Sequence, residues 1–155
     1  MNKHQDQTMA LIMMAHKGQV DKGGVNYWHH PVAVRDLLPE EATKEAQHAA
    51  LLHDVLEDTP ITLQDLRDAG YSEAIIDIVK LVSRTPEDGT YKEWIAKLAN
   101  SGNRSAILVK IADITHNSDP NRLVNLSPED RKNTESMIAK RYSWALKVLN
   151  EALEK

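Results

Sequence analysis

The chain has 155 residues, 41% apolar and 27% charged, a balance typical of one globular domain, so we expect residues 1–155 to form a single domain. It contains no cysteine, which excludes disulfides, thiolate nucleophiles and cysteine metal sites. Its formal net charge of −4 argues against a general nucleic-acid binder. The apolar stretch at 9–15 is too short to span a bilayer, so we expect a cytoplasmic protein with no membrane partner.

Helical periodicity runs through nearly the whole sequence, and no segment alternates convincingly with period two. Three glycines within 18–24 end the first expected helix, Pro31 suits the first turn of the second, and Pro60 closes the third. In chain order the expected helices are 6–16, 31–38, 42–58, 63–69, 72–83, 91–99, 104–117 and 127–153. The sequence therefore predicts an all-α fold, a compact bundle of seven to nine helices.

The adjacent residues His53 and Asp54 carry the strongest chemical signal, because they interrupt an apolar part of the third expected helix. An ionised carboxylate in apolar surroundings is costly unless it is paired or bound to a metal. Imidazole nitrogen and carboxylate oxygen are ligands that Zn, Mn and Fe share. The alternative is a His-Asp pair that faces solvent at the end of a helix.

One helical turn further on, Glu57 and Asp58 follow His53 and Asp54 at a spacing of four residues. This spacing places the two acids on the same faces as the candidate ligands, where a general acid or base is needed. The alternative is a solvated helix end. Negative charge at a helix C-terminus is mildly unfavourable, which makes a functional role more attractive.

Asp113 is a second acidic residue in an otherwise apolar helix. Taken alone, it is either a ligand or a structural residue whose carboxylate is satisfied by hydrogen bonds. His30, directly before Pro31, is a candidate ligand, and His29 competes with it because spacing does not distinguish the two. We expect His16 and His48 to be packing residues. His116, next to Asn117, is either a residue that lines the cleft or a structural residue outside it. His30, His53, Asp54 and Asp113 together would offer two nitrogen and two oxygen donors.

Four short motifs, at 15–19, 27–31, 49–59 and 109–117, resemble the HD-domain phosphohydrolases of the alarmone (ppGpp) hydrolase type. The longest of them reads Ala-Ala-Leu-Leu-His-Asp-Val-Leu-Glu-Asp-Thr. Their order and spacing match across about residues 10–120. The resemblance is to the hydrolase half of the RelA/SpoT enzymes and to the small stand-alone hydrolases, and it implies an HD-domain helical bundle. A chain of 155 residues leaves no space for a synthetase domain.

The resemblance also implies a site and a reaction. The reaction is metal-dependent hydrolysis of the 3′-diphosphate of ppGpp, a small nucleotide substrate, to GDP and pyrophosphate. The implied roles are as follows: metal ligands, usually to Mn²⁺, His30, His53, Asp54 and Asp113; the acidic pair that acts on the attacking water, Glu57 and Asp58; phosphate and ribose contacts, Lys22 and Asn117.

Several positions depart from the family pattern, and two of them lack a basic residue that the family usually has. Asp21 stands where the family usually has Arg, and Ile114 replaces a frequent Arg directly after Asp113. We expect the Asp21 carboxylate to repel a highly anionic substrate. The alternatives are an HD phosphatase for another nucleotide, such as a nucleoside monophosphate or NADPH, and a non-catalytic helical domain that binds a metal or a nucleotide.

Overall fold

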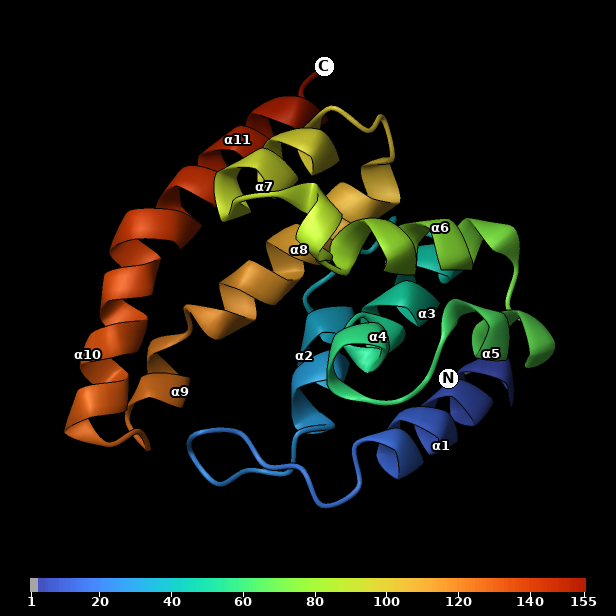
Figure 1. The fold of residues 1–155 in the computed structure, drawn as a ribbon, viewed down its shortest axis with the longest axis horizontal. Coiled ribbons are helices and arrows are strands. Elements are labelled where there is room, and N and C mark those ends of the chain that lie inside the picture. Colours follow the sequence, from blue (N-terminus) through green and yellow to red (C-terminus); the bar gives the residue numbers. More distant parts are fainter. Residues whose placement is uncertain (1–2) are drawn as a thin grey trace.

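A computed structural model describes residues 3–155, and in this range the chain is all-α without a β-strand (Figure 1). The first half contains α1 (Lys3–Ala15), α2 (His29–Asp36), α3 (Lys44–Leu52), α4 (Val55–Asp58), α5 (Leu63–Asp68) and α6 (Glu73–Val82). The second half contains η1 (Pro86–Asp88), α7 (Tyr91–Ala99), α8 (Arg104–Asn117), α9 (Pro120–Leu123), α10 (Pro128–Met137), η2 (Ile138–Tyr142) and α11 (Ser143–Leu153). Two α-segments, α4 and α9, are single turns, which leaves nine longer helices in the described range and confirms the predicted helical bundle.

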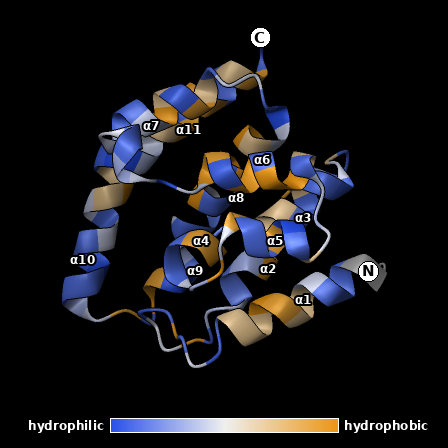
Figure 2. Cartoon of the chain, turned by 45° about the vertical axis from the view of Figure 1, so that its right-hand side comes forward, coloured by the Kyte–Doolittle hydropathy of each residue, from blue (hydrophilic) through white to orange (hydrophobic). Residues whose placement is uncertain are grey.

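Helix α3 lies at the centre of the fold and packs against α1, α2, α6 and α8. Helix α8 also contacts α2 and α11, so it links the two halves of the bundle. In Figure 1, α10 and α11 form an arm beside this centre, and Figure 2 shows that the surface of α10 is mostly hydrophilic. The helices that carry the candidate ligands, α2, α3 and α8, are thus mutual neighbours.

The core is aliphatic, as expected for a chain without phenylalanine. Leu51 and Leu52 of α3, Ile76 of α6 and Ile95 of α7 are fully buried within it. Ile114 is also fully buried, so the side chain that follows Asp113 belongs to the core rather than to a substrate cleft. Apolar burial of this kind fixes the positions of the helices that hold the site.

The expected long helix at 42–58 was wrong, because the chain turns at His53 and Asp54 between α3 and α4. The Nδ1 atom of His53 lies 2.7 Å from the carbonyl oxygen of Ala50 and occupies an acceptor that a continuing helix would use. Asp54 has φ −102° and ψ −2°, outside ideal helical values. The break redirects both side chains towards the interior, which an unbroken helix would not do.

The expected single helix at 127–153 was also wrong, because the π-turn η2 divides it into α10 and α11. Ser127 caps α10 at the expected start of this segment, since its hydroxyl accepts a hydrogen bond from the N–H of Asp130. The hydroxyl of Ser143 donates to the carbonyl of Ile138, five residues earlier, within the wide turn. π-Turns of this kind often occur at functional sites, and here Tyr142 at the end of η2 lines a cavity.

Candidate active site

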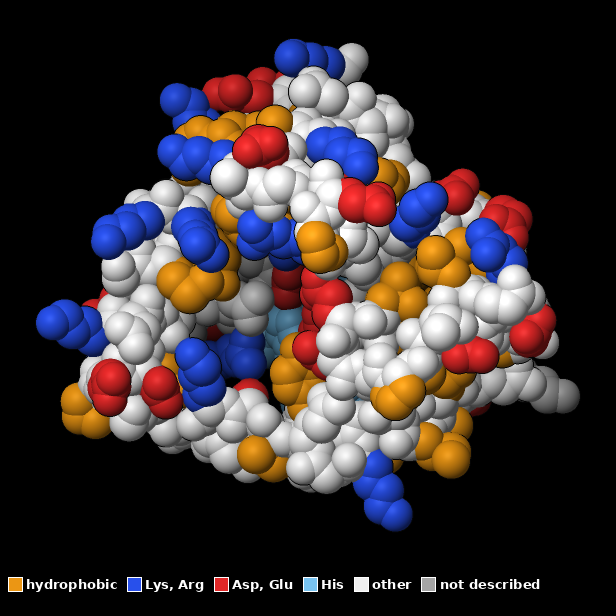
Figure 3. All heavy atoms as spheres, in the orientation of Figure 1, with side chains coloured by type: hydrophobic (Ala, Val, Ile, Leu, Met, Phe, Trp, Pro, Cys, Tyr) orange, Lys and Arg blue, Asp and Glu red, His pale blue; other side chains and the backbone are white. Residues whose placement is uncertain are grey.

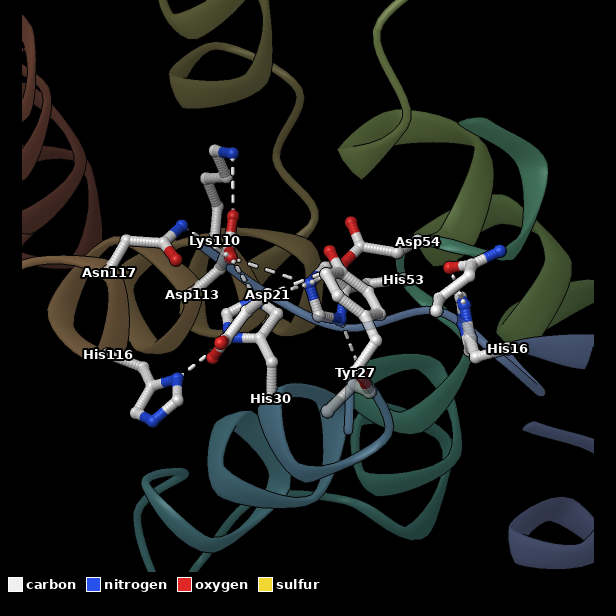
Figure 4. A network of polar contacts seen from close by, with 12 residues as sticks. His16, Asp21, Tyr27, His30, His53, Asp54, Lys110, Asp113, His116 and Asn117 are labelled. Atoms are coloured by element: carbon white, nitrogen blue, oxygen red, sulfur yellow. Dashed lines mark hydrogen bonds and ion pairs between the residues drawn. The ribbon is translucent and has the colours of Figure 1, made fainter. Parts of the chain in front are cut away.

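The structure brings His30, His53 and Asp54 together from two different parts of the chain (Figure 4). One ligand atom from each residue lies within 4.8 Å of the others. His30 is in the first turn of α2, and the other two residues form the break after α3. The Nε2 atoms of His30 and His53 are 3.2 Å apart, and His53 Nε2 is 3.0 Å from Asp54 Oδ2.

Asp113 of α8 completes the set of four donors that was predicted. Its Oδ1 atom is 2.9 Å from His30 Nε2 and 3.4 Å from His53 Nε2. Its other oxygen accepts a hydrogen bond from the buried Lys110 ammonium at 2.8 Å. The carboxylate is therefore oriented by Lys110 on one side and faces the two imidazoles on the other. We call His30, His53, Asp54 and Asp113 the HD cluster.

Hydrogen bonding at His53 shows that the HD cluster fits a divalent cation. A backbone carbonyl only accepts, so the Nδ1 atom of His53 that faces Ala50 carries the proton. In the neutral ring, Nε2 then has a free lone pair, and it points at His30 and the two carboxylates. Two imidazole nitrogens and two carboxylate oxygens that converge in this way suit Zn, Mn or Fe.

The electrostatics of the HD cluster favour positive charge at its centre. Burial alone lowers the pKa of His53, but the carboxylates of Asp54 and Asp113 outweigh it and raise that pKa well above its usual value. Burial likewise raises the pKa of Asp54, yet the neighbouring His53 lowers it to about 2. Two carboxylates that remain ionised in a buried site need a cation beside them. A divalent metal would meet this need.

His30 and His29, which the sequence did not distinguish, have different environments. His30 is buried in the HD cluster, whereas His29 is exposed and stacks on Trp28 with ring centroids 3.9 Å apart. His116 stacks on the other side of His30, and their Nδ1 atoms are 2.7 Å apart. The geometry therefore selects His30 as the candidate ligand and places His116 against it.

The two other predicted packing histidines are buried away from the HD cluster ligands. His48 Nδ1 hydrogen-bonds with the hydroxyl of Thr8, and His16 Nδ1 with the side-chain oxygen of Gln19. His16 also packs against the ring of Tyr27, with centroids 5.1 Å apart. Tyr27 in turn donates a hydrogen bond to Asp54 at 2.6 Å, so His16 supports a residue that holds a member of the cluster.

Glu57 and Asp58 lie in α4, the single turn that follows the HD cluster, and both residues are exposed. The Oε1 atom of Glu57 accepts a hydrogen bond from the backbone N–H of Arg84 at 2.7 Å, which fixes this side chain. Desolvation and the nearby Asp54 carboxylate raise the pKa of Glu57, and the same two causes raise the pKa of Asp58. Two carboxyls with raised pKa values beside a metal-type cluster are suited to proton transfer.

Next to the HD cluster is a cavity of about 390 Å³, to which both predicted substrate-binding residues contribute. Lys22 is exposed at its edge, and Asn117 donates a hydrogen bond to Asp113 Oδ1 at 3.1 Å. The rest of the lining comes mainly from 20–27, α9, α10 and η2. Figure 3 shows the hollow, with histidine and acidic side chains deep inside it and Lys and Arg side chains on one side.

Asp21, which we expected to repel an anionic substrate, is an ion-paired charge in the structure. Its Oδ2 atom forms an ion pair with Arg122 at 3.3 Å. Its Oδ1 atom accepts hydrogen bonds from the backbone N–H groups of Gly23 and Val25, which holds the loop before α2 in shape. Burial opposes ionisation of Asp21, but these bonds and Arg122 together lower its pKa.

Arg122 and Lys110 are two residues that sequence reasoning missed as site components. Arg122 lies in the helix α9, which is too short, at four residues, to be predicted from hydrophobic periodicity. Lys110 lies three residues before Asp113, and this helical spacing is the signal that could have identified it. Both residues reach the site only because the fold brings their helices to it.

The described residues thus combine an all-α fold with buried His and Asp donors that converge beside a cavity of about 390 Å³, an arrangement that suits a metal site. The pattern of the HD domain family matches residues 8–118, and the chain belongs to this family. Membership in it implies a divalent metal, for which His30, His53 and Asp54 of the HD cluster are a possible site. None of the helices described in residues 3–155 is long and apolar enough to cross a membrane.

Curated relatives are large bacterial proteins of guanosine polyphosphate metabolism. The chain is 35% identical over 127 residues to the guanosine-3′,5′-bis(diphosphate) 3′-pyrophosphohydrolase of Haemophilus influenzae. It is 34% identical over 129 residues to the bifunctional (p)ppGpp synthase/hydrolase SpoT of Escherichia coli. Both matches cover 76% of this chain but only 18% of the relative, so the similarity concerns one segment of those proteins.

A solved structure shares the fold over nearly the full length of both chains. It is described as a metazoan ortholog of SpoT that hydrolyzes ppGpp and plays a role in starvation responses. The TM-score is 0.71, and the match covers 99% of this chain and 96% of the other at 19% sequence identity. This likeness confirms the HD-domain bundle.

Proposed function

We propose that this protein is a metal-dependent phosphohydrolase that removes the 3′-pyrophosphate of (p)ppGpp and leaves GDP or GTP. The observation that carries the proposal is the convergence of four metal-type donors beside the cavity: the two Nε2 atoms are 3.2 Å apart, and the Asp54 and Asp113 oxygens lie 2.9–3.7 Å from them. The names of the bacterial relatives support the choice of substrate. We also propose that residues 1–155 act as a single HD-type domain.

The HD cluster residues His30, His53, Asp54 and Asp113 would hold one divalent ion, and we propose Mn²⁺. When bound, such an ion supplies Lewis-acid stabilisation of charge on phosphoryl oxygens. The protein prepares this position before the substrate arrives. Lys110 and Tyr27 hold Asp113 and Asp54, and Ala50 fixes the tautomer of His53.

Glu57 and Asp58 would position the attacking water and accept its proton. The Arg84 N–H occupies one oxygen of Glu57, and the second oxygen of the same carboxylate can receive a water proton. The raised pKa of each acid makes it a stronger base than an ordinary surface carboxylate. General base catalysis of this kind typically contributes about 10²–10⁴-fold to turnover.

Lys22 and Asn117 would contact the phosphates and the ribose of the nucleotide in the cavity. Lys22 offers an exposed ammonium at the edge, and Asn117 lies between the HD cluster and the cavity through its bond to Asp113. Leu123, Leu126 and Met137 supply an apolar part of the lining. A nucleotide has the matching chemistry, with an apolar base and an anionic end.

A substrate panel tests the proposal directly. The metal-loaded protein is incubated with ppGpp, pppGpp, NADPH and GMP, and pyrophosphate and phosphate are scored separately. We expect pyrophosphate and GDP from ppGpp, loss of this activity in Asp54→Asn, and full activity in His29→Ala as the control. Phosphate release from NADPH or GMP alone would indicate an HD phosphatase for another nucleotide. No turnover on any substrate would indicate a non-catalytic binding domain.

A further inference from the structure

Arg122 is a cation at the boundary between the cavity and the HD cluster, and no feature of the cluster requires it. Its Nη1 atom donates to Asn117 Oδ1 at 2.8 Å and lies 3.4 Å from His116 Nδ1. His116 in turn contacts His30, so one side chain separates the guanidinium from a candidate metal ligand. Arg122 also lines the cavity itself.

Asp21 holds this guanidinium from the opposite side. Its carboxylate contacts Nη2 of Arg122 at 3.3 Å across 101 positions of sequence, from a loop that the same carboxylate shapes through Gly23 and Val25. The Arg122 side chain is therefore anchored between α8 and the loop that precedes α2. An arginine fixed in this way loses little conformational entropy when it binds an anion.

The anchoring contacts leave binding capacity on Arg122. A guanidinium carries five N–H groups, and the contacts to Asp21, Asn117 and His116 account for three of them. The described cavity lining contains two cations, Arg122 and Lys22, against the single carboxylate of Asp21. The net charge of the lining side chains is therefore positive, although Asp21 is one of them.

We propose that Arg122 is a phosphate receptor of this cavity and that Asp21 is a residue that positions it. The chemical class of the ligand is a phosphate group of a nucleoside polyphosphate. Arginine suits this ligand because its planar fork matches phosphate oxygens. The proposal rests on the proposed function in one respect, namely that the nucleotide occupies this cavity during hydrolysis. Asp21, where the family usually has Arg, thus recruits a guanidinium from α9 instead of repelling the substrate.

Equilibrium binding of ppGpp, GDP and guanosine to the protein, measured by calorimetry without metal so that ppGpp is not hydrolysed, tests this receptor. In Arg122→Gln we expect ppGpp to bind about tenfold more weakly, since hydrogen bonds to charged groups are the strong ones. Guanosine should bind as in the wild type. A matching loss for GDP identifies a 5′-phosphate as the ligand, and a loss for ppGpp alone identifies the 3′-diphosphate. Equal binding of ppGpp to both proteins, or none to the wild type, overturns the proposal.

Two further variants separate recognition by the guanidinium from an effect of net charge. Arg122→Lys keeps the charge but not the fork, so it should lie between the wild type and Arg122→Gln. Arg131→Gln removes an exposed arginine of α10 that pairs with Glu135, and it should bind ppGpp normally. A loss in Arg131→Gln as large as in Arg122→Gln would show that only net charge matters and would overturn the receptor.

The role of Asp21 is tested by Asp21→Asn, which keeps an acceptor for Gly23 and Val25 but not the charge. We expect KM for ppGpp to rise about threefold with kcat unchanged, and no further rise when the change is made in Arg122→Gln. A lower KM in both backgrounds would show that Asp21 repels the substrate. The calorimetric results do not depend on the reaction, so a protein that binds ppGpp through Arg122 but releases no pyrophosphate disproves only the proposed function.

Discussion

The Nε2 atoms of His30 and His53 lie 3.2 Å apart, although the two residues belong to different helices and are separated by 23 positions. The Nδ1 atom of His53 donates to the Ala50 carbonyl, so its Nε2 atom is the one that faces His30 and could contribute to a metal site. The carboxylates of Asp54 and Asp113 approach the same point. This relationship connects the fold with the chemistry that we propose.

The first prediction concerns the metal. Elemental analysis of protein purified without chelator should find about one divalent ion per chain, because the four donors converge on one position. His53→Ala and Asp113→Ala should each lose this ion and the activity. His29→Ala, which removes the exposed neighbour of His30, is the matched control and should keep both. Full metal content in His53→Ala would contradict the ligand assignment.

The second prediction separates proton transfer from metal binding. Glu57→Gln and Asp58→Asn keep the shape of each side chain but remove its basicity, so the metal content and the fold should be retained. Turnover of ppGpp should fall by about 10²–10⁴-fold in at least one of them. Glu87→Gln, an exposed acid in η1, should turn over normally. Unchanged turnover in both site variants would mean that the reaction needs no base from α4.

The third prediction is a pH dependence. A general base acts only when it is deprotonated, so activity falls as the pH drops below its pKa. Desolvation and Asp54 raise the pKa of Glu57 above 4.5, which moves this loss to higher pH than for an ordinary glutamate. The acid limb of the kcat profile should therefore lie above 4.5 and should change in Glu57→Gln. Metal content must be measured at each pH, because protonation of the ligands also releases the ion.

The fourth prediction concerns the buried ion pair between Lys110 and Asp113. Burial lowers the pKa of Lys110, but Asp113 outweighs it and keeps the ammonium charged. Lys110→Met leaves a buried carboxylate without its partner, which typically costs about 3–5 kcal/mol. Urea denaturation without added metal should show this loss. Arg131→Met breaks the exposed pair with Glu135 and should cost less than about 1 kcal/mol. Similar losses of unfolding free energy in both variants would show that the Lys110–Asp113 pair stabilises the fold no more than an exposed ion pair does.

Sequence reasoning predicted the helical class and most helix ends, for which local signals were sufficient. The residues that meet in the HD cluster were predicted with the help of the family resemblance. The hydroxyls of Thr62, Ser72 and Ser127 each accept a capping hydrogen bond at the start of a helix, and the glycine at position 70 follows α5. His53 and Asp54 stood out because polar groups are rare in an apolar helix. The metal identity, the roles of Glu57 and Asp58 and the substrate contacts stay predictions.

Tertiary structure decided the features that depend on distant partners. Periodicity predicts a continuous helix through Asp54, and the break there depends on a hydrogen bond from the His53 ring to the backbone of Ala50. The choice of His30 over His29 depends on packing against His116, and the neutralisation of Asp21 depends on Arg122, 101 positions away. The sequence by itself determined which donors and helices exist, because these follow from local chemistry. Only the packing of α2, α8 and α9 determined which charges meet, because electrostatic pairing depends on distance in space.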